Sequence, residues 1–117
     1  MTEINMFFEY SHDDNLDQAA HLLQDRLSQM EMVNEVEAAP ENMRINGLEI
    51  AAAIGVTVLV ARGSRELFEA VRKFVIDIKG LMLDLHDLKN VYVDLGAQRI
   101  PINKFGLEHC RQLAKIS

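Results

Sequence analysis

IAAAIGVTVLVARGS, at residues 50–64, is the most apolar stretch of the chain, and its conformation decides the fold. Between Glu49 and Arg62 it contains twelve uncharged, mostly apolar residues. A helix rises about 1.5 Å per residue, so these residues would span about 18 Å, whereas the hydrocarbon core of a bilayer is about 30 Å thick. The stretch is therefore too short to cross a membrane as a helix, and we expect no stable membrane insertion.

Two soluble conformations are compatible with this stretch. The alanines at 51–53 favour a helix, whereas the run from Val56 to Val60 favours a buried strand. If it is a strand, Gly63-Ser64 before the next helix could form a turn whose backbone N–H groups bind a nucleotide or phosphate, although no complete phosphate-loop motif is present. We favour the helix, apolar on all sides over Ile50–Ala61 and ended at Gly63-Ser64.

The flanking segments have clear periodicities. Residues 4–10 alternate as a strand does, and residues 16–30 place apolar side chains at steps of four and three, as on an amphipathic helix. Residues 33–39 are interpreted as a second strand. Residues 67–88 repeat the four-three spacing over about six turns, which predicts a long amphipathic helix. Residues 90–102 indicate a hairpin that turns at Gly96-Ala97, with Pro101 on an edge strand.

These segments predict one α+β domain over residues 1–117. We expect a small mixed β-sheet of about four strands, including a C-terminal β-hairpin, packed with two amphipathic helices and one apolar small-residue helix. Such a small domain can hardly cover every side of an apolar helix, so we expect part of that helix to bind a protein partner or a second copy of the chain. Its candidate interaction residues are Ile50, Ile54 and Val58.

A basic stripe on the long helix supplies the other candidate interaction residues. Arg65, Arg72, Lys79 and His86 recur every seven residues, opposite the apolar face. The stripe is either a solvated helix face or a docking strip for an acidic partner surface.

The charge of the chain is unevenly distributed along the sequence. The net charge is −6, but residues 1–49 hold eleven acidic residues against two arginines, and residues 50–117 hold seven acidic residues against ten basic ones. An acidic chain is a poor nucleic-acid binder, because phosphate contacts need clustered cations. A polarised chain can instead bind other proteins or copies of itself through opposite patches, or its two halves can neutralise each other inside one fold. Alternatively, the acidic half could imitate nucleic-acid phosphates in a small inhibitor, which requires its carboxylates to gather on one exposed face.

The chain lacks catalytic signatures. His12-Asp13-Asp14 is better explained as helix capping than as a metal site, and His109-Cys110 are helical neighbours whose side chains diverge, with Cys110 expected to be a buried, inert thiol. We therefore predict no catalytic residues, no metal and no cofactor, and not an enzyme. One cysteine and the absence of a signal-peptide pattern at residues 1–10 predict a cytoplasmic location.

The predicted order of elements resembles the Effector Associated Constant Component family of bacterial conflict systems. The matching residues are Gly47-Leu48 with Ile50–Ala61, the Gly63-Ser64 break, Leu67–Val75 and Val91–Ile102. The resemblance implies a non-catalytic adaptor or sensor component encoded beside effectors such as proteases and NTPases. It would couple recognition of an invader to activation of an associated effector in antiviral defence. The resemblance supplies no catalytic motif.

Overall fold

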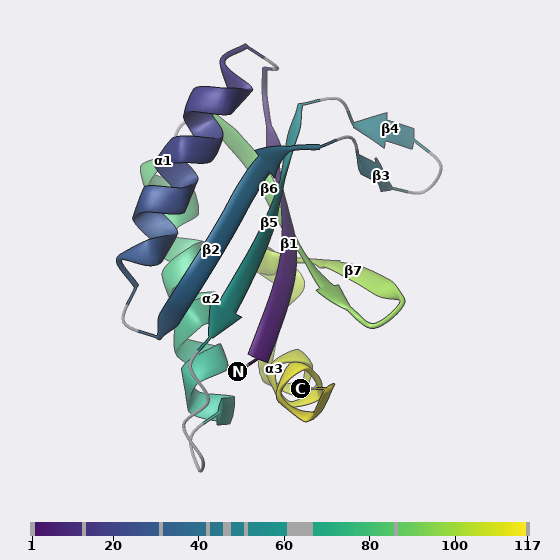
Figure 1. The fold of residues 1–117 in the computed structure, drawn as a ribbon. Helices are drawn as coiled ribbons and strands as arrows, with labels where there is room; N and C mark the ends of the chain where they lie inside the picture. Colours follow the sequence, from purple (N-terminus) through teal and green to yellow (C-terminus); the bar gives the residue numbers. More distant parts are fainter. Residues whose placement is uncertain are drawn as a thin grey trace.

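The computed structural model describes residues 2–12, 14–30, 32–41, 43–45, 48–50, 52–60, 67–85 and 87–116. Within these ranges three helices and seven strands follow one another along the chain (Figure 1). In order they are β1 (Thr2–Tyr10), α1 (Leu16–Ser28), β2 (Val33–Pro40), β3 (Met43–Ile45), β4 (Leu48–Ile50), β5 (Ala53–Val60), α2 (Leu67–Asp84), β6 (Leu88–Leu95), β7 (Gln98–Pro101), a 3-10 turn (Ile102–Lys104) and α3 (Leu107–Ile116).

Five of the described strands form one antiparallel sheet in the order β2-β5-β1-β6-β7. β3 and β4 pair with each other and form a two-stranded arm, which lies between β2 and β5 in the sequence. The units β1-α1-β2 and β5-α2-β6 interleave, because β5 lies between β1 and β2 while β1 lies between β5 and β6. This is the split β-α-β arrangement of ferredoxin-like domains, extended by β7.

The predicted helix over Ile50–Ala61 is wrong. Residues 53–60 form strand β5, and Ile50 belongs to β4. β5 pairs with β1 along one side and with β2 along the other. Pairing on both sides satisfies its backbone, and its β-branched residues pack well on a pleated surface, so tertiary context overrides the helix propensity of the alanines. The apolar stretch is therefore a central strand, as in the alternative interpretation.

Other parts of the predicted fold are confirmed in coarse form. The domain is α+β, and its two amphipathic helices are α1 and α2. The C-terminal hairpin is β6–β7, which turns through Gly96 at φ 63°, and Pro101 lies on the edge strand β7. The sheet differs from the prediction in having five strands, and in being antiparallel where a mixed sheet was predicted.

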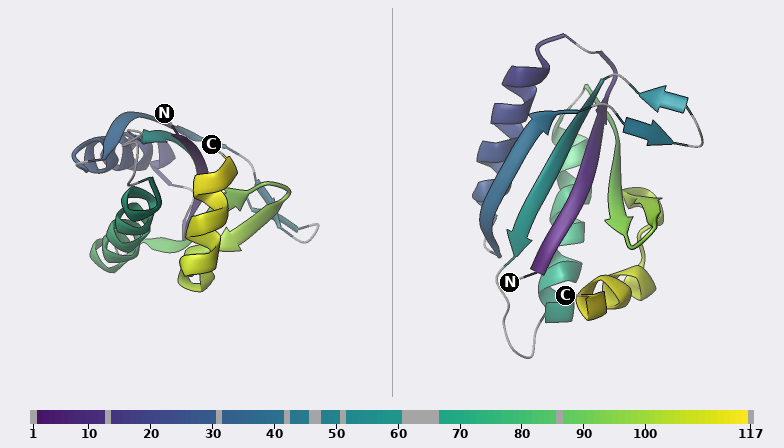
Figure 2. Two further views of the ribbon diagram at one scale, coloured as in Figure 1. Left: turned by 90° about the horizontal axis from the view of Figure 1, so that it is seen from below. Right: turned by 45° about the vertical axis from the view of Figure 1, so that its right-hand side comes forward.

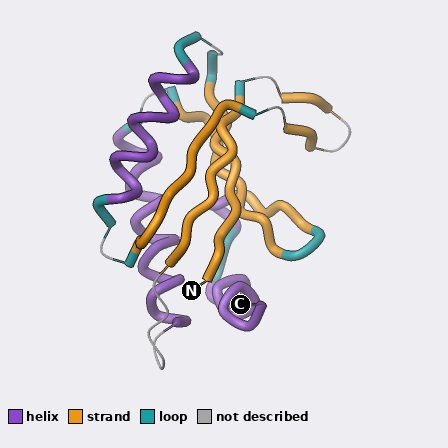
Figure 3. The backbone as a smooth tube through the Cα atoms, viewed as in Figure 1, coloured by secondary structure: helices purple, strands orange, loops and turns teal. Residues whose placement is uncertain are grey.

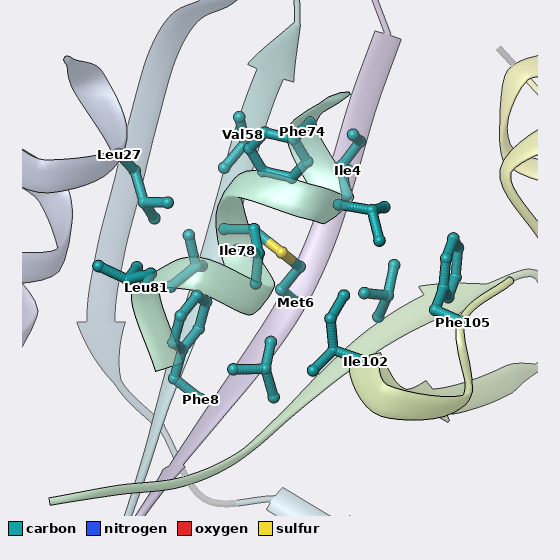
Figure 4. Close-up of a cluster of buried hydrophobic side chains, with 14 of the residues drawn as sticks. Ile4, Met6, Phe8, Leu27, Val58, Phe74, Ile78, Leu81, Ile102 and Phe105 are labelled. Atoms are coloured by element: carbon teal, nitrogen blue, oxygen red, sulfur yellow. The ribbon is translucent and has the colours of Figure 1, made fainter. Parts of the chain in front are cut away.

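The core lies between one face of the sheet and the helices. Ile4, Met6 and Phe8 of β1 point toward α1 and α2, together with the even-numbered residues of β5 (Figure 4). Both helices lie on the same side of the sheet, and α3 packs against α2 (Figure 2). No helix in the described ranges covers the opposite face, along which the strands run uncovered in Figure 3. Nor is any described helix long and apolar enough to span a bilayer.

Candidate functional site

The uncovered side of the sheet, here called the open face, carries the alternate residues that do not enter the core. Because directly paired residues in an antiparallel sheet share a face, the register assigns each strand's contribution from β1 outward. The open face comprises Glu3, Asn5, Phe7 and Glu9 of β1, Ala53, Gly55, Thr57 and Leu59 of β5, Glu35, Glu37 and Ala39 of β2, Asn90, Tyr92 and Asp94 of β6, and Arg99 and Pro101 of β7.

Acidic side chains outnumber basic ones on this face. Glu3, Glu35 and Glu37 are exposed, and Glu41 follows directly after β2. Within the described part of the chain, none of these four carboxylates forms an ion pair. The uncompensated charge therefore makes the open face attractive to cations and repulsive to phosphates.

Glu9 is the buried acid of the open face and is held by its neighbours. Its side chain is 11 % exposed, and its carboxylate accepts hydrogen bonds from Asn90 Nδ2 at 3.1 Å and from the Tyr92 hydroxyl at 3.4 Å. Lys89 Nζ lies 3.9 Å away. Burial raises the pKa of the Tyr92 hydroxyl, and the Glu9 carboxylate raises it further. These contacts satisfy Glu9, so we assign it a structural role.

One guanidinium is already bound on the open face. The Cζ atom of Arg99 lies 4.2 Å from the centroid of the Phe7 ring. Arg99 Nε also donates to Asp94 Oδ1 at 3.1 Å. Phe7 is buried although it points away from the main core. The face thus holds a cation between an aromatic ring and a carboxylate, which is a favourable environment for a guanidinium.

A shallow depression of about 590 Å³ lies beside this pair. Gly55, Thr57 and Asn5 contribute to its lining, and the Thr57 hydroxyl donates to Asn5 Oδ1 at 2.9 Å. The side chain of Glu41 lies so close to Gly55 that its carboxylate takes the place of a β-carbon. The backbone N–H of Glu41 donates to the Ala53 carbonyl at 3.0 Å, which fixes where this side chain starts. The acids that line the depression are Glu37, Glu41 and Asp94.

Two of the predicted interaction residues lie in the core rather than at the surface. Ile54 and Val58 are 0 % exposed and lie in the core, because β5 is central in the sheet. The side chain of Ile50 lies outside the described residues, as do Gly63, Ser64 and Arg65. Self-association through an apolar helix at 50–61 therefore loses its surface.

The two described residues of the basic stripe, Arg72 and Lys79, each contact another part of this chain. Lys79 Nζ donates to the Phe105 carbonyl at 3.3 Å, just before α3, and Arg72 pairs with Glu69 at 3.5 Å. Burial raises the pKa of the Cys110 thiol on α3, against the opposing effect of Lys79 and Arg72. Arg72 and Lys79 therefore lie close to α3, whereas Arg65 and His86 lie outside the described residues, so the docking strip for an acidic partner surface stays a prediction.

The other residues considered as catalytic or metal-binding groups are Cys110, His109 and His12. Cys110 is buried, as predicted, and its neighbour His109 accepts a hydrogen bond at Nδ1 from the Gly106 N–H at 3.0 Å. This imidazole faces the start of α3. His12 is exposed, whereas Asp13 lies outside the described residues. Among the residues that are described, no three His, Cys, Asp or Glu side chains gather as a metal site would require.

Sequence reasoning missed the open face, although its signal is present. Glu3, Asn5 and Glu9 alternate with buried residues of β1, and Glu35 and Glu37 alternate in β2. These acids come together because β5 pairs with both strands. No family model, no curated protein and no solved structure matches this chain, so the proposals below stand on its own geometry and on the resemblance of its sequence pattern.

Proposed function

We propose that this protein is a non-catalytic protein-interaction component that binds a basic partner surface through its open face. The observation that carries the proposal is an uncovered sheet face that holds the buried ring of Phe7 and is lined by four carboxylates for which the described residues supply no ion-pair partner. Aromatic and charged side chains on a rigid sheet are a preorganised surface, which lowers the entropic cost of binding. The acidic charge also accelerates the encounter with a basic partner.

The resemblance to the Effector Associated Constant Component family extends this proposal to a biological setting. In that setting the partner is an effector or sensor component of a bacterial conflict system, and the protein couples recognition of an invader to the effector. A homo-oligomer stays a prediction, and it now requires a surface other than residues 50–61. Light scattering at high micromolar concentration tests it directly.

The test compares two tagged variants of equal net charge in the native host. One variant carries Glu35→Gln and Glu37→Gln on the open face, and its control carries Asp17→Asn and Asp25→Asn, two exposed acids of α1 on the other side of the sheet. We expect a specific companion protein to co-purify with the wild type and the control but not with the open-face variant. Equal recovery of the companion with all three proteins would contradict the proposal.

A second candidate, the small acidic inhibitor that imitates nucleic-acid phosphates, is favoured by one observation. Glu35, Glu37 and Glu41 lie along a single strand and its continuation, and Glu3 shares their face. Other acids of the N-terminal half, Asp17 and Asp25, lie on α1 instead. The two candidates differ in the identity of the companion. If it is a nucleic-acid enzyme and duplex DNA displaces the wild-type protein from it, the inhibitor is favoured over the adaptor.

A further inference from the structure

The depression above Gly55 has the features of a pocket for one side chain of a binding partner. The first feature is the example set by Arg99. Its guanidinium is held between the Phe7 ring and the Asp94 carboxylate on the same face. Such a pair of contacts is typical of arginine, whose flat cation stacks on rings and binds carboxylates through two N–H groups. The open face therefore already stabilises the chemical group that a basic partner presents.

The second feature is the position of Glu41. Because position 55 has no side chain, the Glu41 carboxylate can lie close to the backbone of β5, although the residue remains exposed. Glu37 lines the same depression from β2. Both residues are exposed, so a cation of a binding partner can reach their carboxylates. Among the described residues neither Glu37 nor Glu41 forms an ion pair, so both carboxylates are available to a cation of the partner.

The third feature is that the chain carries a net charge of −6, and three of its described cations are engaged elsewhere. Arg26 pairs with Asp84 at 3.1 Å, Arg111 pairs with Glu108 at 3.7 Å, and Lys79 donates to a backbone carbonyl. The complement of the depression is therefore better supplied by a different protein than by a second copy of this chain. A phosphate-bearing ligand is disfavoured, because it would face the acids that line the depression.

We infer that the depression binds an arginine side chain of the partner protein, with Glu37 and Glu41 as its ion-pair partners and Gly55 as the residue that keeps Glu41 in place. This inference rests on the proposed function and names the partner's contact chemistry. It makes Glu41 the specificity-determining residue of the open face. Lysine fits less well, because an ammonium cannot bind two carboxylates in the planar geometry of a guanidinium.

The test uses three short synthetic peptides and NMR of the full chain. The peptides carry two arginines in a Gly/Ser background, two lysines in the same places, or two citrullines, which keep the shape of arginine without its charge. We expect the arginine peptide to shift the amide signals of residues 37–41 and 53–57. We expect weaker binding of the lysine peptide and none of the citrulline peptide.

Three variants assign the binding to the depression. Glu41→Gln should weaken arginine-peptide binding about tenfold, which corresponds to about 1.4 kcal/mol. Gly55→Ala should weaken it although the net charge is unchanged, because the new methyl group displaces the Glu41 carboxylate. The paired control Asp17→Asn with Asp25→Asn should stay within about twofold of the wild type, because exposed distant charges contribute little. Glu41→Gln conserves shape, so it carries the test even if Gly55→Ala fails to fold.

The outcomes separate this inference from the proposed function. Absence of binding at millimolar arginine peptide, or an equal loss in Glu41→Gln and the control, overturns the arginine pocket. If the native companion is nevertheless lost with the open-face variant Glu35→Gln with Glu37→Gln, the proposed function stands without the pocket. If that companion is retained, both proposals are wrong.

Discussion

The carboxylate of Glu41 lies directly over Gly55, in the place that a β-carbon at position 55 would occupy. Glu41 follows the last residue of β2, and Gly55 lies within β5. The hydrogen bond from Glu41 N–H to the Ala53 carbonyl brings them together. A glycine within a central strand ordinarily weakens it, since it adds backbone entropy to the unfolded chain and offers no side chain to pack. At position 55 this cost in stability is accompanied by the close approach of the Glu41 carboxylate.

We expect Gly55→Ala to leave the domain folded with a free energy of unfolding within about 1 kcal/mol of the wild type. The overlapping atoms are at the tip of a flexible exposed side chain that can move aside, and alanine reduces the entropy of the unfolded chain. Urea denaturation followed by circular dichroism measures the change. A loss well above that value would mean that the Glu41 contact is held more firmly than its exposure indicates.

The central position of β5 predicts a large cost for truncating its core residues. Ile54 is completely buried, so Ile54→Ala should lower the free energy of unfolding by about 2–5 kcal/mol. The matched control is Leu83→Ala on α2, where the side chain is 83 % exposed and the cost should stay within about 0.5 kcal/mol. Similar small effects at both positions would support the apolar-helix interpretation of residues 50–61 over the strand.

Arg99 and Phe7 should be energetically coupled. Replacing Arg99 by alanine removes the cation from the Phe7 ring and the ion pair with Asp94, both at the partly exposed edge of the sheet. In a double-mutant cycle of Arg99→Ala with Phe7→Leu, we expect a coupling free energy of about 0.5–1 kcal/mol. Arg99→Lys should retain part of the charge effect but lose the stacking. A coupling indistinguishable from zero would show that the contact is incidental.

The protein should lose stability in strongly alkaline solution through Tyr10. Burial, together with the nearby Asp87 carboxylate, raises the pKa of the Tyr10 hydroxyl to about 12, whereas an unfolded tyrosine has a pKa of 10.0. The folded chain therefore holds this proton more tightly than the unfolded chain. The resulting stability is fully present below pH 10 and is lost as the pH rises toward 12.

Tyr10→Phe should reduce the loss of stability at alkaline pH. It should also change the pH dependence of tyrosine absorbance. The chain has two tyrosines, so the variant leaves only Tyr92, whose pKa burial also raises. Melting temperatures of wild type and variant, measured from neutral pH to pH 12, test the assignment. Parallel curves for the two proteins would contradict it.

The sequence predicted local structure well where one face of an element is buried. The alternation in residues 4–10 and the four-three spacing of residues 67–85 each correspond to a one-sided contact with the core. The same reasoning failed for β5, because residues 50–61 are almost wholly apolar and show no alternation between polar and apolar side chains. Gly55 and Thr57 were the only departures from that apolar character, and both lie on the open face.

The candidate site was harder to predict, since it is assembled from strands distant in the sequence. Glu37 of β2 and Asp94 of β6 line one depression although two strands, β5 and β1, lie between them in the sheet. Only the pairing of β5 with β1 and β2 places the N-terminal acids on a common surface. The basic stripe of α2 is easy to recognise in the sequence. Its contact with the segment before α3, through Lys79 and the Phe105 carbonyl, depends on the packing of α3 against α2 and is not visible in the spacing.

The β3–β4 arm branches from the sheet between two paired strands and pairs, within the described residues, only with itself. Its length can consequently change without shifting the register of β2 against β5. An arm of this kind is a tolerant point for insertion. Because its base begins beside Glu41, a fluorophore attached there would report directly on occupancy of the neighbouring depression.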